Sequence, residues 1–150
     1  MLCLSAPVRR FAIALLVMLA AACTPPETLD FSEVEPPTSR DADVVIRPVG
    51  DSGMVELRAG QVLAVEMKST FAWREASPPI LLRRQVTLGA PADRAGRDRG
   101  TTGGPTWQVF VYRALEPGEA TVEFVEARAW EPDNITDRYA LIVRVLPGSD

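Results

Sequence analysis

The chain has no histidine, a single lysine and only two cysteines in 150 residues. Without imidazole, Ser-His-Asp and Cys-His nucleophile arrangements are excluded, as are zinc sites built from histidine and cysteine. Ser-Lys chemistry is disfavoured too, because no Ser-x-x-Lys motif precedes Lys68. We therefore expect neither an enzyme nor a protein that holds a metal or a cofactor.

One long hydrophobic run lies near the N-terminus. It covers residues 11–22, is preceded by Arg9 and Arg10, and is followed by Cys23. A run of about 12 residues is too short for a bilayer, which needs ~20 helical residues, but it fits the core of an export signal. The small residues before Cys23 are typical of a bacterial lipoprotein signal, with an ordinary secretory signal as the alternative. We predict a signal peptide over 1–22, acylation of Cys23, and an extracytoplasmic lipoprotein at the outer membrane or cell surface.

Loss of residues 1–22 decides the cysteine count and the charge. Cys3 leaves with the signal, so Cys23 has no partner for a disulfide within the chain. The mature chain keeps 14 of the 16 basic residues against 20 acidic ones, a net charge of −6. This negative charge disfavours nucleic acid as a partner.

Residues 23–42 are acidic and contain Pro25, Pro26, Pro36 and Pro37. Such a composition is typical of a disordered tether. As a coil of about 19 residues it would reach ~25 Å and hold a domain clear of the lipid. A disordered tail without a spacing role is the alternative.

Residues 43–150 are dominated by short runs in which apolar and polar residues alternate, and they suffice for one domain with its own core. No segment has sustained helical periodicity, and turn signals such as Pro117-Gly118 recur. This pattern predicts an all-β, monomeric, immunoglobulin-like β-sandwich of seven to eight strands. The expected strands lie near residues 44–46, 54–57, 62–67, 71–73, 80–88, 107–114, 119–127 and 138–146.

The C-terminal half reads G-G-P-T-W-Q-V-F-V-Y-R-A-L-E-P-G-E-A-T-V-E-F-V-E-A-R-A-W-E, followed by Y-A-L-I-V-R-V. Its order of Gly-Gly loop, aromatic-bearing strand, Pro-Gly turn, strand and Arg-x-aromatic motif resembles the chagasin family of cysteine-peptidase inhibitors. Upstream, A-G-Q-V-L-A-V-E-M resembles the strand before the family's first inhibitory loop. The resemblance implies an immunoglobulin-like protein whose loops enter the active-site cleft of papain-like cysteine peptidases.

The resemblance also implies two flanking peptidase-binding loops. Gly103 and Gly104 match the family's glycine-rich loop, while Arg128, Ala129 and Trp130 match its Arg-Pro-aromatic loop, with alanine in place of proline. Each feature has a plainer interpretation. The glycines would only permit positive φ, and the tryptophan would only cover the open end of the sandwich.

The third, central loop carries Asn-Pro-Thr-Thr-Gly in the family. Between Val65 and Trp73 this chain has only E-M-K-S-T-F-A, which is several residues too short for that motif. Lys68, Ser69 and Thr70 stand in its place.

Together these features predict an envelope-tethered inhibitor of papain-like cysteine peptidases, or a derivative of one, with weakened inhibition. The alternative is a non-inhibitory protein-binding or structural module of the cell envelope, which would keep the sandwich and lose the central loop. The arginines within residues 89–100 are expected to solvate a mobile loop.

Overall fold

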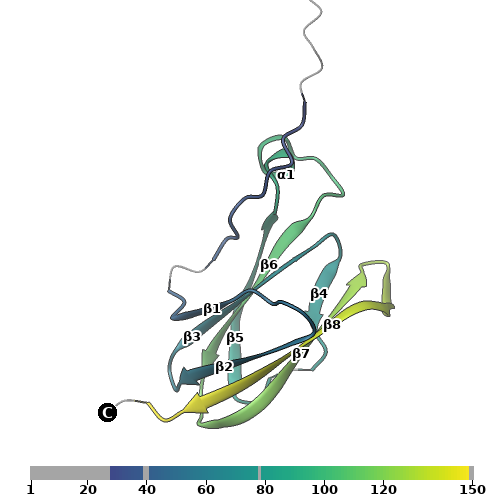
Figure 1. Cartoon of the computed structure of the whole chain (residues 1–150). Helices are drawn as coiled ribbons and strands as arrows, with labels where there is room; N and C mark the ends of the chain where they lie inside the picture. The colour runs from purple at the N-terminus through teal and green to yellow at the C-terminus, as the bar shows by residue number, and fades with distance from the viewer. Residues whose placement is uncertain (1–27, 39–40, 78, 149–150) are drawn as a thin grey trace, which may run out of the picture.

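The computed structural model describes residues 28–38, 41–77 and 79–148. Two four-stranded sheets face each other (Figure 1), which confirms the predicted immunoglobulin-like sandwich and gives it eight strands. The predicted signal peptide over 1–22 and the acylation site at Cys23 lie outside the described residues. No helix within the described ranges is long and apolar enough to cross a membrane.

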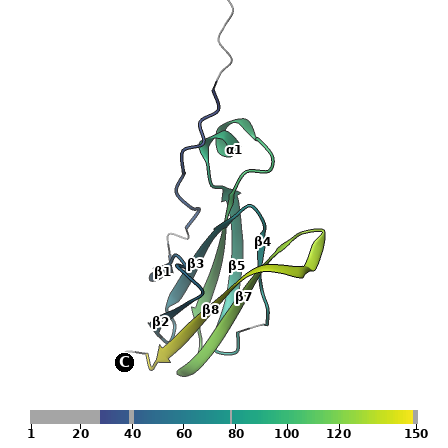
Figure 2. The same cartoon turned by 45° about the vertical axis from the view of Figure 1, so that its right-hand side comes forward.

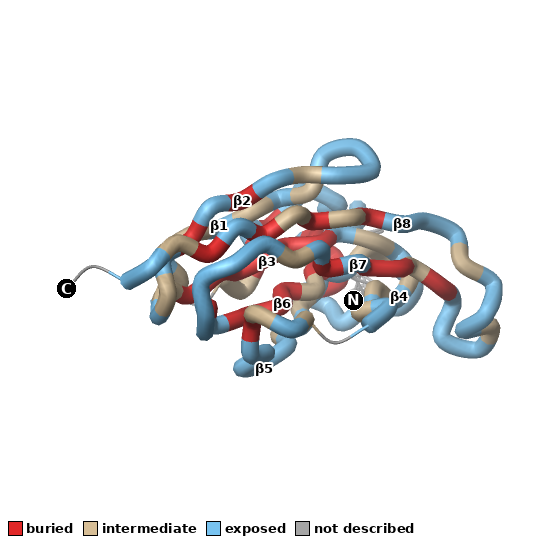
Figure 3. The backbone as a smooth tube through the Cα atoms, turned by 90° about the horizontal axis from the view of Figure 1, so that it is seen from below, coloured by how far each residue is buried: buried red, intermediate tan, exposed pale blue. Residues whose placement is uncertain are grey.

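The first sheet has the strand order β1-β3-β6-β5. Its short edge strand β1 runs parallel to β3, and the other neighbours are antiparallel. The opposite edge strand, β5, is mostly exposed (Figure 3), and its arginines are the kind of charge that protects a sheet edge. The strands are β1 (Val44–Ile46), β3 (Val62–Ser69), β6 (Thr106–Ala114) and β5 (Leu82–Pro91).

The second sheet has the order β2-β8-β7-β4. β2 runs parallel to β8, whereas β8 with β7 and β7 with β4 are antiparallel. β7 and β8 form one long hairpin whose tip projects beyond the sandwich (Figures 1 and 2). The strands are β2 (Ser52–Arg58), β8 (Glu131–Leu146), β7 (Gly118–Arg128) and β4 (Ala72–Glu75).

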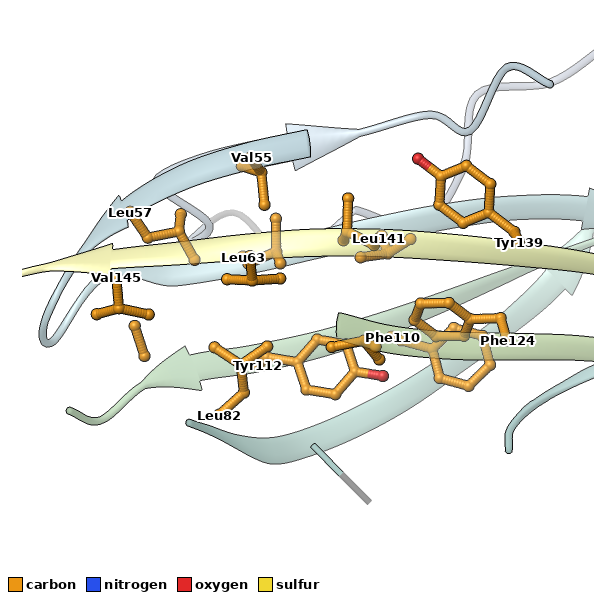
Figure 4. Close-up of a cluster of buried hydrophobic side chains, with 14 of the residues drawn as sticks. Val55, Leu57, Leu63, Leu82, Phe110, Tyr112, Phe124, Tyr139, Leu141 and Val145 are labelled. Carbon is orange, nitrogen blue, oxygen red and sulfur yellow. The ribbon is translucent and has the colours of Figure 1, made fainter. Parts of the chain in front are cut away.

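The core lies between the two sheets and follows the alternation in the sequence (Figure 4). Burial of the apolar side chains that point into the space between the sheets is the main favourable term in folding. Phe110 of one sheet packs against Phe124 of the other, with ring centres 5.1 Å apart. The predicted inward face of the last strand is confirmed by the burial of Tyr139, Leu141, Val143 and Val145.

One short helix, α1 (Arg94–Arg99), lies where the sequence analysis expected only a mobile loop. Asp93 caps its N-terminus by accepting a hydrogen bond from Gly96 N at 2.6 Å. Gly100 ends it in the left-handed conformation, with φ of 65°. Six residues are too few to produce a helical periodicity in the sequence, so this expectation was wrong.

Within the range 23–42, where a disordered tether was expected, the structure describes residues 28–38 and 41–42. Residues 30–38, here called the N-terminal strap, run from α1 toward β1 along the first sheet (Figures 1 and 2). Val34 and Pro36 are buried, and the Val34 amide donates to Ala92 O at 3.0 Å. The prolines and acidic residues suggested disorder, but two apolar side chains and backbone pairing fix the strap on the sandwich.

Candidate functional site

Three segments meet at one end of the sandwich, the end at which α1 lies (Figure 1). They are the β3–β4 turn, the segment 92–105 that carries α1, and the tip of the β7–β8 hairpin. The strand register brings them together, because Ser69 pairs with Thr106 and Ala72 pairs with Ala127. The central turn therefore lies between the other two segments at this end of the sandwich.

The central segment is a turn of only two residues, Thr70 and Phe71, between β3 and β4. Ser69 belongs to β3, and its hydroxyl accepts a hydrogen bond from Phe71 N at 2.8 Å. Lys68 also belongs to β3, and its Nζ lies 2.5 Å from Glu33 of the N-terminal strap. Of the three residues expected to form the central wedge, only Thr70 therefore lies in the turn.

Glu126 of β7 joins the central turn to the hairpin. Its carboxylate accepts hydrogen bonds from the Ser69 hydroxyl and from Thr136 Oγ1, the latter at 2.8 Å. Nearby, the Arg128 guanidinium lies 5.4 Å from the ring centre of Phe71. These contacts fix the two segments relative to each other. The contact between Ser69 and Glu126 could not be predicted from the sequence, because the two residues are 57 positions apart.

The hairpin tip presents an aromatic side chain to solvent. Ala129 and Trp130 connect β7 to β8, and Trp130 is 73% exposed. This exposure contradicts the interpretation of Trp130 as a cover for the open end of the sandwich. Arg128 lies beside it and pairs with Glu131 at 3.6 Å.

The two glycines of the third segment have different structural roles. Gly103 has φ of 81° and open space around it, as the conformational interpretation predicted. Gly104 instead packs against the buried carboxylate of Asp93, where an added Cβ would stand 3.0 Å from Oδ2. The base of the segment is closed by a hydrogen bond from Ala92 N to Pro105 O at 2.9 Å.

A cavity of about 340 Å³ lies between β3 and the residues that follow β1. Glu66 lines it with a fully buried side chain, and Arg47 Nε donates to Glu66 Oε2 at 2.6 Å. This hydrogen bond, and a second one to Glu35, raise the pKa of Arg47. Trp107, which is 5% exposed, lies beneath the Arg47 guanidinium with its ring centre 5.7 Å away. The sequence analysis singled out neither Glu66 nor Trp107.

The described part of the chain contains no group of three or more cysteine, histidine or acidic residues placed to hold a metal ion. It does contain a central turn and a hairpin that are braced against each other, and the hairpin tip exposes one aromatic residue. Such a surface is suited to contact another protein.

Comparisons with known proteins agree with this geometry. The family model for the chagasin family peptidase inhibitor I42 matches residues 47–143. No curated protein sequence matches the chain.

Solved structures share the fold at low sequence identity. The cysteine protease inhibitor EhICP2 from Entamoeba histolytica matches with a TM-score of 0.55 and 12% identity, covering 69% of this chain and 96% of its own. Amebosin matches with a TM-score of 0.56 and 16% identity, covering 69% and 97%. The family model spans well over half of the chain, and the chain therefore belongs to the chagasin family of peptidase inhibitors.

Proposed function

We propose that this protein is an envelope-tethered inhibitor of papain-like cysteine peptidases with a weakened central contact. The observation that carries the proposal is the exposed Trp130 on a hairpin that is braced against the central turn, at the end of the sandwich where the segment 92–105 also lies. Family membership supports it, because the matched model describes peptidase inhibitors.

The inhibitor acts as a plug in the active-site cleft. Trp130 is the apolar anchor, since it is exposed on a hairpin that its neighbours hold in place. Gly103 allows the backbone of its segment to approach the peptidase closely, and Thr70 and Phe71 form the shortened wedge. Affinity comes from loops that are ordered before binding, so little conformational entropy is lost in the complex.

The two-residue central turn sets the expected strength. Loss of one interface hot spot of ~2 kcal/mol weakens binding roughly 30-fold. A turn that ends at Thr70 and Phe71 cannot present a five-residue wedge. We therefore expect weak inhibition of papain that depends on Trp130.

The inhibition constant of the mature chain against papain tests the proposal. Trp130→Ala should weaken inhibition at least tenfold, because it removes the exposed anchor. Ile80→Ala is the matched control, since Ile80 is 81% exposed and lies at the opposite end, next to Leu81, which bonds to Leu115. Equal effects of the two substitutions would contradict the proposed role of Trp130.

Replacement of Thr70 by Asn-Pro-Thr-Thr-Gly tests the central turn itself. The exchange leaves Ser69 in place, so the contact between its hydroxyl and Glu126 is kept. We expect this variant to inhibit papain more tightly than the wild type. Sub-nanomolar inhibition by the wild type would refute the claim that the turn is impaired.

A second candidate function is a non-inhibitory protein-binding or structural module of the envelope. The short β3–β4 turn favours it, because such a module has no need of a central wedge. If the Asn-Pro-Thr-Thr-Gly variant folds normally and still does not inhibit papain, this second function replaces the first.

The tether is a separate part of the proposal. The hydrophobic run ending at Cys23 supports acylation at that residue. Cys23→Ser should abolish palmitate labelling in cells and release the protein from membranes, whereas Cys3→Ser, in the signal, should do neither. Unlabelled, soluble wild-type protein would contradict the lipoprotein assignment.

A further inference from the structure

We propose that the N-terminal strap contributes to the proposed peptidase-binding surface at the end of the sandwich where α1 lies, because it holds the segment 92–105 in its conformation. Release of the strap loosens that segment. The inference rests on the proposed function only where it concerns inhibition. The claim that the strap orders the segment 92–105 rests on contacts between residues that the structure describes.

The strap pairs with the beginning of the segment as a short antiparallel strand. Val34 N donates to Ala92 O, and Arg94 N donates to Ser32 O, both at 3.0 Å. These two bonds flank Asp93, which forms an antiparallel bridge with Glu33. The strap therefore fixes the backbone on both sides of the residue that caps α1.

Asp93 passes this constraint on to the rest of the segment. Its buried carboxylate accepts from Gly96 N at 2.6 Å, and its carbonyl accepts from Arg97 N at 3.1 Å. The same carboxylate lies against Gly104 at the other end of the segment. A shift of Asp93 would thus disturb both the helix cap and the packing of the glycine loop.

Trp107 fastens the strap to the sheet beneath. Its Nε1 donates to Val34 O at 2.8 Å, and its ring is buried. Trp107 pairs with Ala90 in the sheet, directly before the segment begins. Val34 is consequently bonded to the first residue of the segment and to β6, the strand that follows it.

The Thr38 hydroxyl also donates a hydrogen bond to the buried Glu66 carboxylate. The other side-chain contacts between the strap and the sheet are ion pairs that solvent reaches. Glu33 pairs with Lys68 at 2.5 Å, and Glu35 pairs with Arg47 at 2.8 Å. Exposed pairs of this kind contribute little to stability. The strap is held mainly by Val34, Pro36 and a few hydrogen bonds, so it opens at a lower free energy than the core does.

Hydrogen exchange of the mature chain, followed by mass spectrometry, tests the coupling. Val34→Asp places a charge at the buried contact and should speed exchange over residues 91–105 at least tenfold. Exchange in the core of β7 and β8 should stay unchanged. Phe31→Ser is the matched control, because Phe31 lies in the strap and is 64% exposed.

Unchanged exchange over 91–105, in a Val34→Asp protein whose strap has become unprotected, would overturn the inference. If the Val34→Asp protein also loses protection in the core, hydrogen exchange of the Glu33→Lys variant tests the inference instead. That substitution only reverses a surface charge and sets it against Lys68. It should speed exchange over 91–105 by a smaller factor than Val34→Asp does. Unchanged exchange over 91–105 in a Glu33→Lys protein whose strap has become unprotected would overturn the inference.

Papain inhibition by the same variants separates this inference from the proposed function. Weaker inhibition by Val34→Asp than by Phe31→Ser supports a working role of the strap in binding. Inhibition that stays unchanged although 91–105 exchanges faster overturns that role. If the wild type does not inhibit at all, the proposed function fails, and the exchange result still decides whether the strap orders the segment.

Discussion

The carboxylate of Asp93 lies directly against Gly104, although the two residues stand at opposite ends of the segment that carries α1. A Cβ on Gly104 would come within 3.0 Å of Asp93 Oδ2. Because Gly104 has no side chain, the buried carboxylate of Asp93 can cap α1 and pack against Gly104 at the same time. The contact between Asp93 and Gly104 thus links the two ends of the segment 92–105.

Substitution of each glycine should reveal its separate role. Gly104→Ala should displace the Asp93 carboxylate, lower the unfolding free energy by about 1 kcal/mol and speed amide exchange in α1. Gly103→Ala should cost a similar ~1 kcal/mol through its positive φ, without a change in α1. Gly103→Asn should recover most of that loss, because asparagine tolerates this conformation. Urea denaturation and amide exchange measure these effects, and equal exchange in α1 for both alanine variants would contradict them.

Both tyrosines should ionise at a higher pH in the folded protein than in the unfolded chain. Burial raises the pKa of Tyr112 and a hydrogen bond to Glu75 raises it further, while burial raises the pKa of Tyr139. These are the only two tyrosines. The folded state keeps protons that the unfolded state releases above pH ~10, so stability is full below that pH and falls as pH rises beyond it. Tyrosinate absorbance should therefore rise at a higher pH in the folded protein than in urea-unfolded protein, and equal titration curves would contradict this prediction.

The pair of Arg47 and Glu66 should be strongly coupled. Arg47→Met leaves the fully buried Glu66 carboxylate without its cation and should cost about 2 kcal/mol in unfolding free energy. The double variant Arg47→Met with Glu66→Met should be more stable than Arg47→Met alone, because no buried charge remains. A double-mutant cycle by urea denaturation measures the coupling. Additive effects would show that the two side chains do not depend on each other.

Buried Trp107 and partly buried Trp73 should differ in their response to replacement by phenylalanine. Trp107 Nε1 donates to Val34 O, whereas Trp73 Nε1 is buried without a hydrogen-bond partner in the described structure. Trp107→Phe loses ring volume and a hydrogen bond, and Trp73→Phe loses ring volume alone. We expect Trp107→Phe to be the more destabilising by about 1 kcal/mol. Equal unfolding free energies would mean that the bond to Val34 contributes nothing.

The parts of this molecule that could be predicted from sequence are those set by local pattern. Alternation over residues 138–146 is visible in the chain and decides which face of β8 is buried. The flanking loops could be placed because Gly103 and Trp130 belong to recognisable motifs. α1 could not be placed, because a helix of this length depends on its cap and on the packing of Asp93.

The strap and the bracing of the central turn depend on partners that are distant in sequence. Val34 is surrounded by proline and acidic residues, and only its pairing with Ala92 and Trp107 makes it part of the fold. Ser69 and Glu126 are ordinary polar residues until the two sheets bring them together. Sequence pattern carries no signal for such pairings.

The docking of the strap decides which way an anchored molecule faces. Cys23 precedes Asp30 by seven residues, a span of about 25 Å at full extension. An acyl chain on Cys23 would keep the loop end near the lipid headgroups, with Ile80 toward the bulk solution. A globular partner of ~200 residues is about 40 Å across and would have to meet the loops from the side, along the bilayer surface. Release of the strap up to Asp43 would extend the span to about 70 Å and open the same loops to partners that arrive from solution.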